Sequence, residues 1–384
     1  MRVLHVIPSV SERSGGPGIA IVPMCRALQA REIEVLLVAT NEGVRELAAS
    51  EVIDYEGVPA IFFPTQLGES FKYSRPLSAW LDANADQFDV GHIHAVFNHS
   101  SVAAARAFRK ARVPYVIRPL GTLDPWSMRQ KALRKRAFWS LVGRTMMSGA
   151  AAVHYTSQTE KTATETLLGV NHGQVIPLGI NAIAAPTRDV DKNQSNGPYV
   201  LVLSRLHPKK GLDVLIDAFI TLTQRSDFDH WRLIIAGDGP ADYVADLKKQ
   251  AAAAADRIIF TGWLDGERKE ETLRNASLLA LPSYQENFGL CVMEALARSV
   301  PVLISPHVNL AEEIGAADAG WIAPVETRVL SETLAAALGD AQELAKRGRA
   351  GKSLSSRYSW ERVATDLVEL YTEITNGSAG LHRV

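Results

Sequence analysis

The sequence predicts an α/β protein built from two doubly wound, Rossmann-like domains. The chain has 384 residues, which is long for one domain and comfortable for two. Short apolar runs rich in β-branched residues recur along it, with helical patterns between them. Such alternation is typical of parallel sheets that helices cover on both faces. A polar segment near the middle of the chain divides these runs into two sets.

The expected strands form two series. Those of the first half lie at residues 3–7, 35–39, 60–63, 90–94, 115–118, 152–155 and 174–176. Those of the second half lie at residues 200–203, 233–236, 258–260, 277–281 and 302–304. After them, apolar side chains at helical spacing predict a terminal helix within residues 360–376. These side chains are Val363, Leu367, Leu370 and Ile374.

Residues 185–198 are polar, rich in turn formers and without apolar periodicity, which predicts an interdomain linker. The N-terminal domain is then residues 1–184, completed by the terminal helix 360–376, and the C-terminal domain is residues 199–359. Ligands of doubly wound folds bind at the carboxyl ends of the strands. We therefore expect the site in a cleft across which the two domains face each other.

The composition excludes several classes of protein. Hydrophobic residues make up 47% of the chain, which argues against disorder, and a formal net charge of −1 gives no electrostatic basis for nucleic-acid binding. Cys25 and Cys291 cannot form a disulfide framework and suit a reducing compartment. We see no signal peptide, and no run approaches the roughly 18 apolar residues that span a bilayer. We expect a cytoplasmic protein.

The most informative motif follows strand 277–281. Glu286 and Glu294 enclose a Phe-Gly-Leu step, residues 288–290, at which a helix is expected to begin. The first amides of a helix lack internal partners and favour anions, so we expect a phosphate there. A carboxylate would repel the phosphate, so the two glutamates are expected to accept hydrogen bonds from hydroxyl groups on the two sides of the phosphate. A ligand with a sugar on one side of its phosphate and a ribose on the other is a nucleotide-sugar. The alternative is two acids on a solvated helix face.

Two cations follow strand 200–203. Arg205 and Lys210 are five residues apart at the carboxyl end of this strand, so both can reach one diphosphate. There they would offset the charge that builds up on a leaving diphosphate. The alternative is a solvated basic turn. The Glu286–Glu294 segment in the same domain favours the functional interpretation.

Together these segments resemble the retaining glycosyltransferases of family 4, which have the two-domain GT-B fold. The resemblance covers essentially the whole chain and is strongest over residues 199–306. It implies that Arg205 and Lys210 bind the donor diphosphate, that Glu286 contacts the donor-sugar hydroxyls and that Glu294 holds the ribose. Arg205, Lys210 and Glu286 are the candidate catalytic residues.

The resemblance also implies backbone contacts with the donor. The residues concerned are Phe288, Gly289 and Leu290 at the phosphate, Gly262 and Trp263 at the base, and the loop with Gly15 and Gly16 over the diphosphate. From the residues alone, a glycine pair permits close backbone approach to a ligand but also suits a plain flexible turn.

One position departs from the family pattern. Leu120 occupies the place at which many relatives have a histidine that contacts the donor sugar. Arg118, Asp124 and His99 are all open as substitutes. Retention in this family is usually ascribed to front-face attack assisted by the leaving phosphate. A protein nucleophile is therefore not required, and transfer without that histidine is compatible with the resemblance.

Residues 91–101 carry three histidines, His92, His94 and His99, at the end of an expected strand. A metal site is one interpretation, but neither Cys nor an acid lies between these histidines. For at least one of His92 and His94, which share the strand, a hydrogen-bonded core histidine is favoured. Asn98 and His99 are candidates for lining the acceptor side of the cleft. Because the sequence also lacks an Asp-x-Asp motif at a strand end, we expect neither a metal nor another cofactor.

Residues 126–139 are a basic stretch with aromatic neighbours, which we expect to be helical. Two interpretations are open for it. Either it is a solvated helix whose aromatic side chains pack inward, or it makes peripheral contact with anionic lipid headgroups at the inner face of the membrane.

The resemblance implies a retaining hexosyltransferase. Its donor would be a UDP-sugar, with a GDP-sugar as the second choice, and its acceptor a glycan or a lipid-linked glycan in exopolysaccharide or lipid-linked oligosaccharide synthesis. Two alternatives stay open: a nucleotide-sugar epimerase on the same fold, and a non-catalytic nucleotide-sugar-binding protein, which Leu120 motivates. The sequence leaves the sugar, the acceptor and the linkage undecided.

Overall fold

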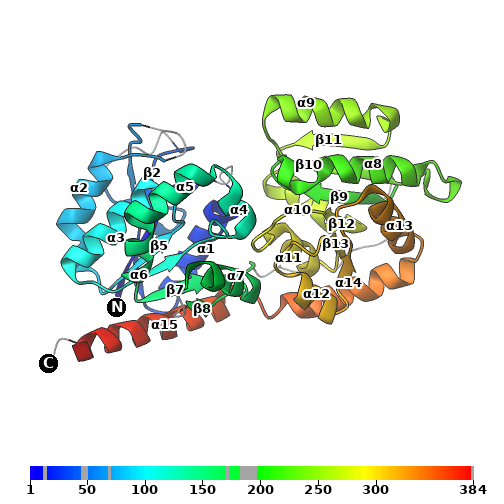
Figure 1. Cartoon of the computed structure of the whole chain (residues 1–384). Coiled ribbons are helices and arrows are strands. Elements are labelled where there is room, and N and C mark those ends of the chain that lie inside the picture. The colour runs from blue at the N-terminus through cyan, green and yellow to red at the C-terminus, as the bar shows by residue number, and fades with distance from the viewer. Residues whose placement is uncertain (12–14, 45–50, 68–70, 170–172, 182–196, 382–384) are drawn as a thin grey trace. The chain divides into compact units, whose positions relative to one another are not determined.

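The computed structural model describes residues 1–11, 15–44, 51–67, 71–169, 173–181 and 197–381. The chain divides into two compact units, Met1–Gly179 with Trp360–Val384, and Ile180–Ser359. Each unit holds one sheet with helices around it (Figure 1), so the predicted α/β fold class is confirmed. Of the predicted linker 185–198, residues 185–196 lie outside the described residues.

The first unit holds an eight-stranded sheet in the order β3-β4-β2-β1-β5-β6-β7-β8. Its strands are β1 Arg2–Ile7, β2 Glu34–Thr40, β3 Ile53–Tyr55, β4 Val58–Phe63, β5 Val90–His94, β6 Tyr115–Arg118, β7 Ala152–Tyr155 and β8 Gly173–Val175. Neighbours pair in parallel except β3 and β4. Glu56 and Gly57 join those two strands with φ of 52° and 81°. Positive φ at both turn residues is typical of a tight two-residue hairpin.

Helices cover both faces of this sheet, so β4 to β7 are buried almost throughout. The helices are α1 Gly16–Gln29, α2 Arg75–Asn84, η3 Ala85–Gln87, α3 His99–Ala111, α4 Pro125–Arg129, α5 Ala132–Phe138, η4 Trp139–Gly143, α6 Arg144–Ser148, α7 Gln158–Leu168 and α15 Trp360–Leu381. The C-terminal helix α15, red in Figure 1, packs against α1. It thus contributes to the core of the first unit.

The second unit holds a six-stranded, fully parallel sheet in the order β11-β10-β9-β12-β13-β14. Its strands are β9 Tyr199–Leu203, β10 Arg232–Ala236, β11 Ile258–Gly262, β12 Leu278–Leu281, β13 Val302–Ile304 and β14 Gly320–Ile322. Its helices are η5 Pro208–Lys210, α8 Leu212–Thr223, η6 Ser226–Phe228, α9 Ala241–Gln250, η7 Ala251–Ala254, α10 Gly266–Arg274, α11 Leu290–Ala297, α12 Ala311–Ala316, α13 Thr327–Leu338 and α14 Ala341–Ser355.

The strand order of the second unit positions its site. From β9 the chain winds to β10 and β11 on one side and then to β12, β13 and β14 on the other. The order therefore reverses between β9 and β12, and ligands of open α/β sheets bind at the carboxyl ends of the strands at such a switch point. No helix in the described ranges is long and apolar enough to cross a lipid bilayer.

Candidate functional site

The switch point brings together the two loops that carry the charged motifs. Loop 204–211 leaves the carboxyl end of β9, and loop 282–289 leaves that of β12, its parallel neighbour. The backbone N–H of Tyr284 donates to the carbonyl of Lys209 at 2.8 Å. The Lys209 ammonium donates to Gln285 Oε1 at 3.0 Å. These contacts hold the two loops together.

Lys210 and Glu286 form a hydrogen-bonded ion pair between these loops, and only 10% and 17% of their side-chain surfaces are exposed. Burial alone would raise the pKa of the Glu286 carboxyl. The charges of Lys210, Lys209 and Arg205 outweigh that effect, so its pKa is lowered. Glu286 is therefore ionised at neutral pH, and exposed Arg205 lies within its electrostatic reach.

The backbone fixes this pair in place. The Glu286 N–H donates to the carbonyl of His307 and its carbonyl accepts from Asn309 N–H, both at 3.0 Å, in the loop after β13. Gly211 has φ of +63°, and a Cβ there would lie 2.4 Å from the Pro282 carbonyl oxygen. Only glycine permits this approach of the β9 loop to the β12 loop.

Helix α11 begins at Leu290, after Gly289 in the left-handed conformation with φ of +74°. Phe288 is 3% exposed, and its ring packs edge-on against Tyr358, with centroids 5.9 Å apart. Along the described part of this helix, the first amide with a hydrogen-bond partner is that of Val292, which donates to the carbonyl of Gly289 at 2.8 Å. The N-terminus of α11 thus presents free backbone N–H groups beside Glu286.

Glu294, one turn further along α11, pairs with Lys269 of α10 at 2.8 Å. The side chains are 23% and 29% exposed for Glu294 and Lys269. Two Lys–Glu pairs therefore flank the start of α11. Between them, burial raises the pKa of Cys291 to about 12, which keeps the thiol protonated at neutral pH.

Sequence reasoning did not find Lys209, Gln285 or Lys269. Lys269 stands within a run of charged residues on α10 whose spacing marks no site. Its contact with Glu294 depends on how α10 packs against α11. Lys209 and Gln285 each adjoin a residue of the predicted motifs, and that adjacency was the available signal.

The remaining candidates lie at other strand ends. Gly262 ends β11 and is exposed, with φ of +72° and no atom within 4 Å of an added Cβ. Its carbonyl already accepts from Gly237 N–H at 2.8 Å, and Trp263 is half-buried beside it. In the first unit, Gly15 is the N-cap of α1 with φ of 103°, and Gly16 is the first residue of that helix.

Two of the three open substitutes for the family histidine have structural partners. His99 Nδ1 accepts from the Ser74 N–H at 3.2 Å, its Nε2 lies 3.2 Å from Ser78 Oγ, and burial lowers its pKa. Asp124 caps α4 by accepting from the Trp126 N–H at 2.8 Å. Arg118 is 1% exposed, and burial lowers its pKa to about 10 despite the charge of Glu160.

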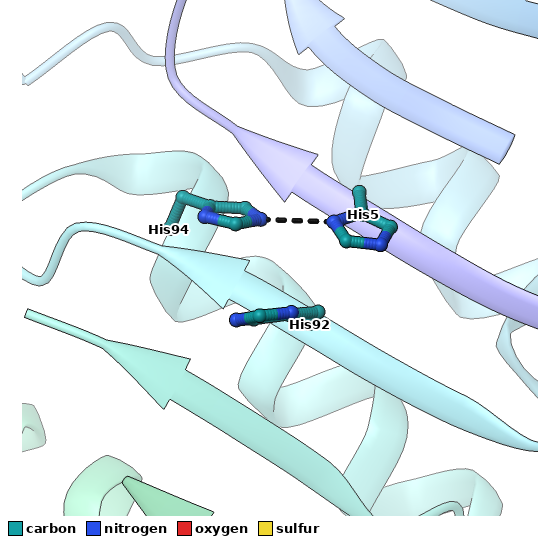
Figure 2. Close-up of side chains that lie close together, drawn as sticks. All are labelled: His5, His92 and His94. Atoms are coloured by element: carbon teal, nitrogen blue, oxygen red, sulfur yellow. Dashed lines mark hydrogen bonds between the residues drawn. The ribbon is translucent and has the colours of Figure 1, made fainter. Parts of the chain in front are cut away.

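A cluster of buried histidines lies on neighbouring strands of the first sheet (Figure 2). His5 of β1 and His92 and His94 of β5 are fully buried, with potential ligand nitrogens within 4.8 Å of one another. Within the described residues this is the one group of three or more metal-ligand side chains. His5 Nδ1 and His94 Nε2 are 3.0 Å apart and hydrogen-bonded.

The hydrogen bonds around His92 determine which of its ring nitrogens carries the proton. His154 Nε2 lies 2.7 Å from the carbonyl of Ile176 and must donate to it, so the Nδ1 of a neutral His154 is an acceptor. His92 Nε2, 3.3 Å away, donates to that Nδ1. His92 Nδ1 then accepts from the Tyr371 hydroxyl at 2.7 Å.

Both nitrogens of His92 are thus engaged. Burial, together with the charges of neighbouring histidines and of Arg118, lowers the pKa of His92, His94 and His154 well below the ordinary range. A cation bound to His5, His92 and His94 would have to break this chain of hydrogen bonds and approach the buried guanidinium of Arg118. The bonds of His92 and His154 are those of neutral core histidines, whereas His5 Nε2 and His94 Nδ1 have no hydrogen-bond partner among the described residues.

Comparisons with known proteins agree with this architecture. Residues 186–354 match the model of glycosyl transferases group 1, and residues 15–179 match that of the glycosyl transferase 4-like domain. Among solved structures, HepE from Anabaena in complex with UDP and glucose has a TM-score of 0.77 at 21% identity over 97% of this chain and 99% of its own. Sucrose-phosphate synthase from Thermosynechococcus elongatus has a TM-score of 0.78 at 18% identity, over 98% and 99%.

Curated relatives match over shorter segments. The phosphatidyl-myo-inositol mannosyltransferase of Mycobacterium tuberculosis is 29% identical over 223 residues, 54% of this chain and 58% of the relative. The D-inositol 3-phosphate glycosyltransferase of Nocardia farcinica is 31% identical over 183 residues, 46% of this chain and 40% of the relative. The chain thus matches about half the length of these relatives. With both halves matched by family models on a two-domain GT-B fold, the chain belongs to the family 4 glycosyltransferases.

Proposed function

We propose that this protein transfers a hexosyl group from a nucleoside-diphosphate sugar, with UDP as the first choice of nucleotide, to an acceptor hydroxyl with retention of anomeric configuration. The observation that carries the proposal is the buried Lys210–Glu286 pair beside the free amides of α11, at the switch point of the second sheet. This site offers cations and N–H groups to a diphosphate and a carboxylate to sugar hydroxyls.

The family resemblance implies the following transfer step. The bond between the anomeric carbon and the diphosphate oxygen breaks, the acceptor oxygen bonds to that carbon on the same face, and the acceptor proton passes to the departing phosphate oxygen. Arg205 and Lys210 stabilise the charge that develops on the diphosphate. Lys210 is largely buried, so its field is weakly screened by water and acts more strongly than that of an exposed lysine.

The other proposed roles complete the donor site. Glu286, ionised at neutral pH, accepts hydrogen bonds from donor-sugar hydroxyls, and Glu294 accepts them from the ribose. The amides of residues 288–290 bind the phosphate, the backbone of Gly262 and Trp263 binds the base, and the loop with Gly15 and Gly16 covers the diphosphate. We propose no cofactor and no metal, because Arg205 and Lys210 provide the positive charge.

The comparisons with known proteins support this proposal. One structural neighbour was solved with UDP-glucose, and two curated relatives are named for transfer to inositol compounds, which carry hydroxyl acceptors. By the same analogy, the acceptor here is a hydroxyl of a glycan or a lipid-linked glycan.

The test measures release of nucleoside diphosphate from a panel of UDP- and GDP-sugars, with and without acceptors. We compare Lys210→Met/Glu286→Gln, which removes both charges of the buried pair, with Lys249→Met, which removes an exposed charge on α9. We expect the double variant to lose about 100-fold or more in rate and Lys249→Met to keep the wild-type rate. Equal rates in both would refute the proposed site. Isomerised donor would indicate an epimerase, and binding without release a non-catalytic protein.

A further inference from the structure

The helical segment after β6 has an unusual outward face. Helices α5, η4 and α6 run without a break over residues 132–148 (Figure 1). Leu133 and Leu141 on this segment are 82% and 79% exposed. No other large hydrophobic side chain of the described residues is as exposed. Exposed aliphatic side chains at one place on a surface indicate an interaction site.

The two leucines lie on one side of the segment. Eight residues of α-helix rotate about 80° beyond two full turns. Residues 139–143 form a π-helix, whose wider turns rotate the chain less per residue. Leu141 lies within this π-helical turn, whose first residues therefore bring it closer to the line of Leu133 than a regular α-helix would.

Cations surround these leucines. Residues 125–151 contain no Asp or Glu, and their basic residues are Arg129, Lys131, Arg134, Lys135, Arg136 and Arg144. All except Lys135 are exposed. Lys135 turns back, and its ammonium donates to the carbonyl and hydroxyl of Ser127 at 2.7 and 2.9 Å. Among the described side chains, none forms an ion pair with the five exposed cations.

The aromatic side chains of this segment face the other way. Phe138 and Trp139 pack against the core of the first unit, and the Phe138 ring lies 5.1 Å from that of Phe97. The sequence left open a membrane contact through residues 126–139 with aromatic neighbours. The structure moves the candidate surface to Leu133, Leu141 and the exposed cations around them.

We propose that this face, residues 129–144, docks the protein on an anionic phospholipid surface. Basic side chains bind the phosphates of the headgroups, and the leucines enter the boundary of the acyl chains. A nucleic acid fits less well, because single strands stack on exposed aromatic rings and the rings here pack inward. The proposal does not depend on the transfer reaction proposed above.

The test uses the full chain in co-sedimentation with phosphatidylcholine vesicles, with and without phosphatidylglycerol. We expect binding to the anionic vesicles only, weakened by salt. Each cation near such a surface raises partition about fivefold, so Arg134→Ser/Arg136→Ser should lower it about 25-fold. Leu133→Ser/Leu141→Ser should also lower it. Leu67→Ser, which removes a 70% exposed leucine elsewhere on the first unit, should bind as the wild type does.

Several outcomes would overturn the proposal. Equal binding to both kinds of vesicle, or full binding by the double leucine variant, excludes docking through this face. A tighter complex with an RNA or DNA oligonucleotide that survives Leu133→Ser/Leu141→Ser assigns the cations to nucleic acid instead. An unchanged thermal unfolding temperature shows that a variant is folded. Nucleoside-diphosphate release without vesicles reports on the donor site separately.

Discussion

Mild acid should destabilise the first unit selectively, because its sheet buries four neutral histidines. Burial and the neighbouring charges lower the pKa of His5 to about 3 and those of His92, His94 and His154 well below the ordinary value. In the unfolded chain each histidine binds a proton near pH 6.5. The unfolded state therefore takes up more protons than the folded state as the pH falls from 7 to 5.

The magnitude follows from proton linkage. A histidine that stays neutral when folded contributes its full stabilisation above pH 6.5 and loses it as the pH falls towards its folded pKa. Between pH 7 and 5 each loses about 2 kcal/mol, and the four together lose ~8 kcal/mol. This approaches the whole stability of an ordinary domain, ~5–15 kcal/mol. Buried Glu160, whose pKa burial raises, offsets part of the loss.

Hydrogen exchange followed by mass spectrometry, in short pulses from pH 7 to 5, distinguishes the two units. We expect peptides of β1 and β5 to lose protection while those of β9 and β12 keep it, since the Glu286 carboxylate, with its lowered pKa, is protonated only in stronger acid. In His154→Gln, unfolding should take up about one proton fewer, so the slope of the unfolding free energy against pH should fall by ~1.4 kcal/mol per pH unit. Equal protection of β1 and β9 down to pH 5 would refute the neutral-histidine core.

Four further substitutions have definite expectations. Glu294→Ala should weaken binding of UDP by ~1–3 kcal/mol in calorimetry while the protein stays folded, and unchanged affinity would exclude the ribose contact. Gly211→Ala places a Cβ 2.4 Å from a carbonyl oxygen, whereas Gly262→Ala meets no atom within 4 Å. Gly211→Ala should therefore lower the thermal unfolding temperature of the second unit more than Gly262→Ala does. Gly262→Ala costs only the strain of the left-handed conformation, ~1–2 kcal/mol. Tyr371→Phe removes the donor to His92 and should destabilise the first unit by ~1–3 kcal/mol in denaturant.

Much of the fold was predictable because strands buried on both faces form continuous apolar runs. β5, β6 and β7 begin and end at the predicted residues. The prediction missed β3 and β14, which are three residues long and lie at the edges of their sheets. β3 reads Ile-Asp-Tyr, which is no apolar run. β14 reads Gly-Trp-Ile, and its glycine and short length hid it although apolar residues flank it. The C-terminal helix also continues beyond its predicted end, to Leu381.

The candidate site was predictable where short loops carry its residues and not where packing assembles it. Lys210 and Glu286 follow strands that the sequence marks, and the parallel pairing of those strands brings them together. The pair of Lys269 with Glu294 depends on the packing of α10 against α11, which no local pattern encodes. The bond between His92 and Tyr371 joins residues 279 positions apart.

Under the proposed function, the two Lys–Glu pairs explain how a buried site can accept a charged donor. A lone buried carboxylate or ammonium is costly, and Lys210 and Glu286 neutralise each other. When a diphosphate reaches the amides of α11, the ammonium can turn to a phosphate oxygen while the carboxylate accepts a sugar hydroxyl. Lys269 and Glu294 permit the same exchange near the ribose. Both protein charges then keep a partner after binding, so the donor diphosphate is the only ion that enters the site from water.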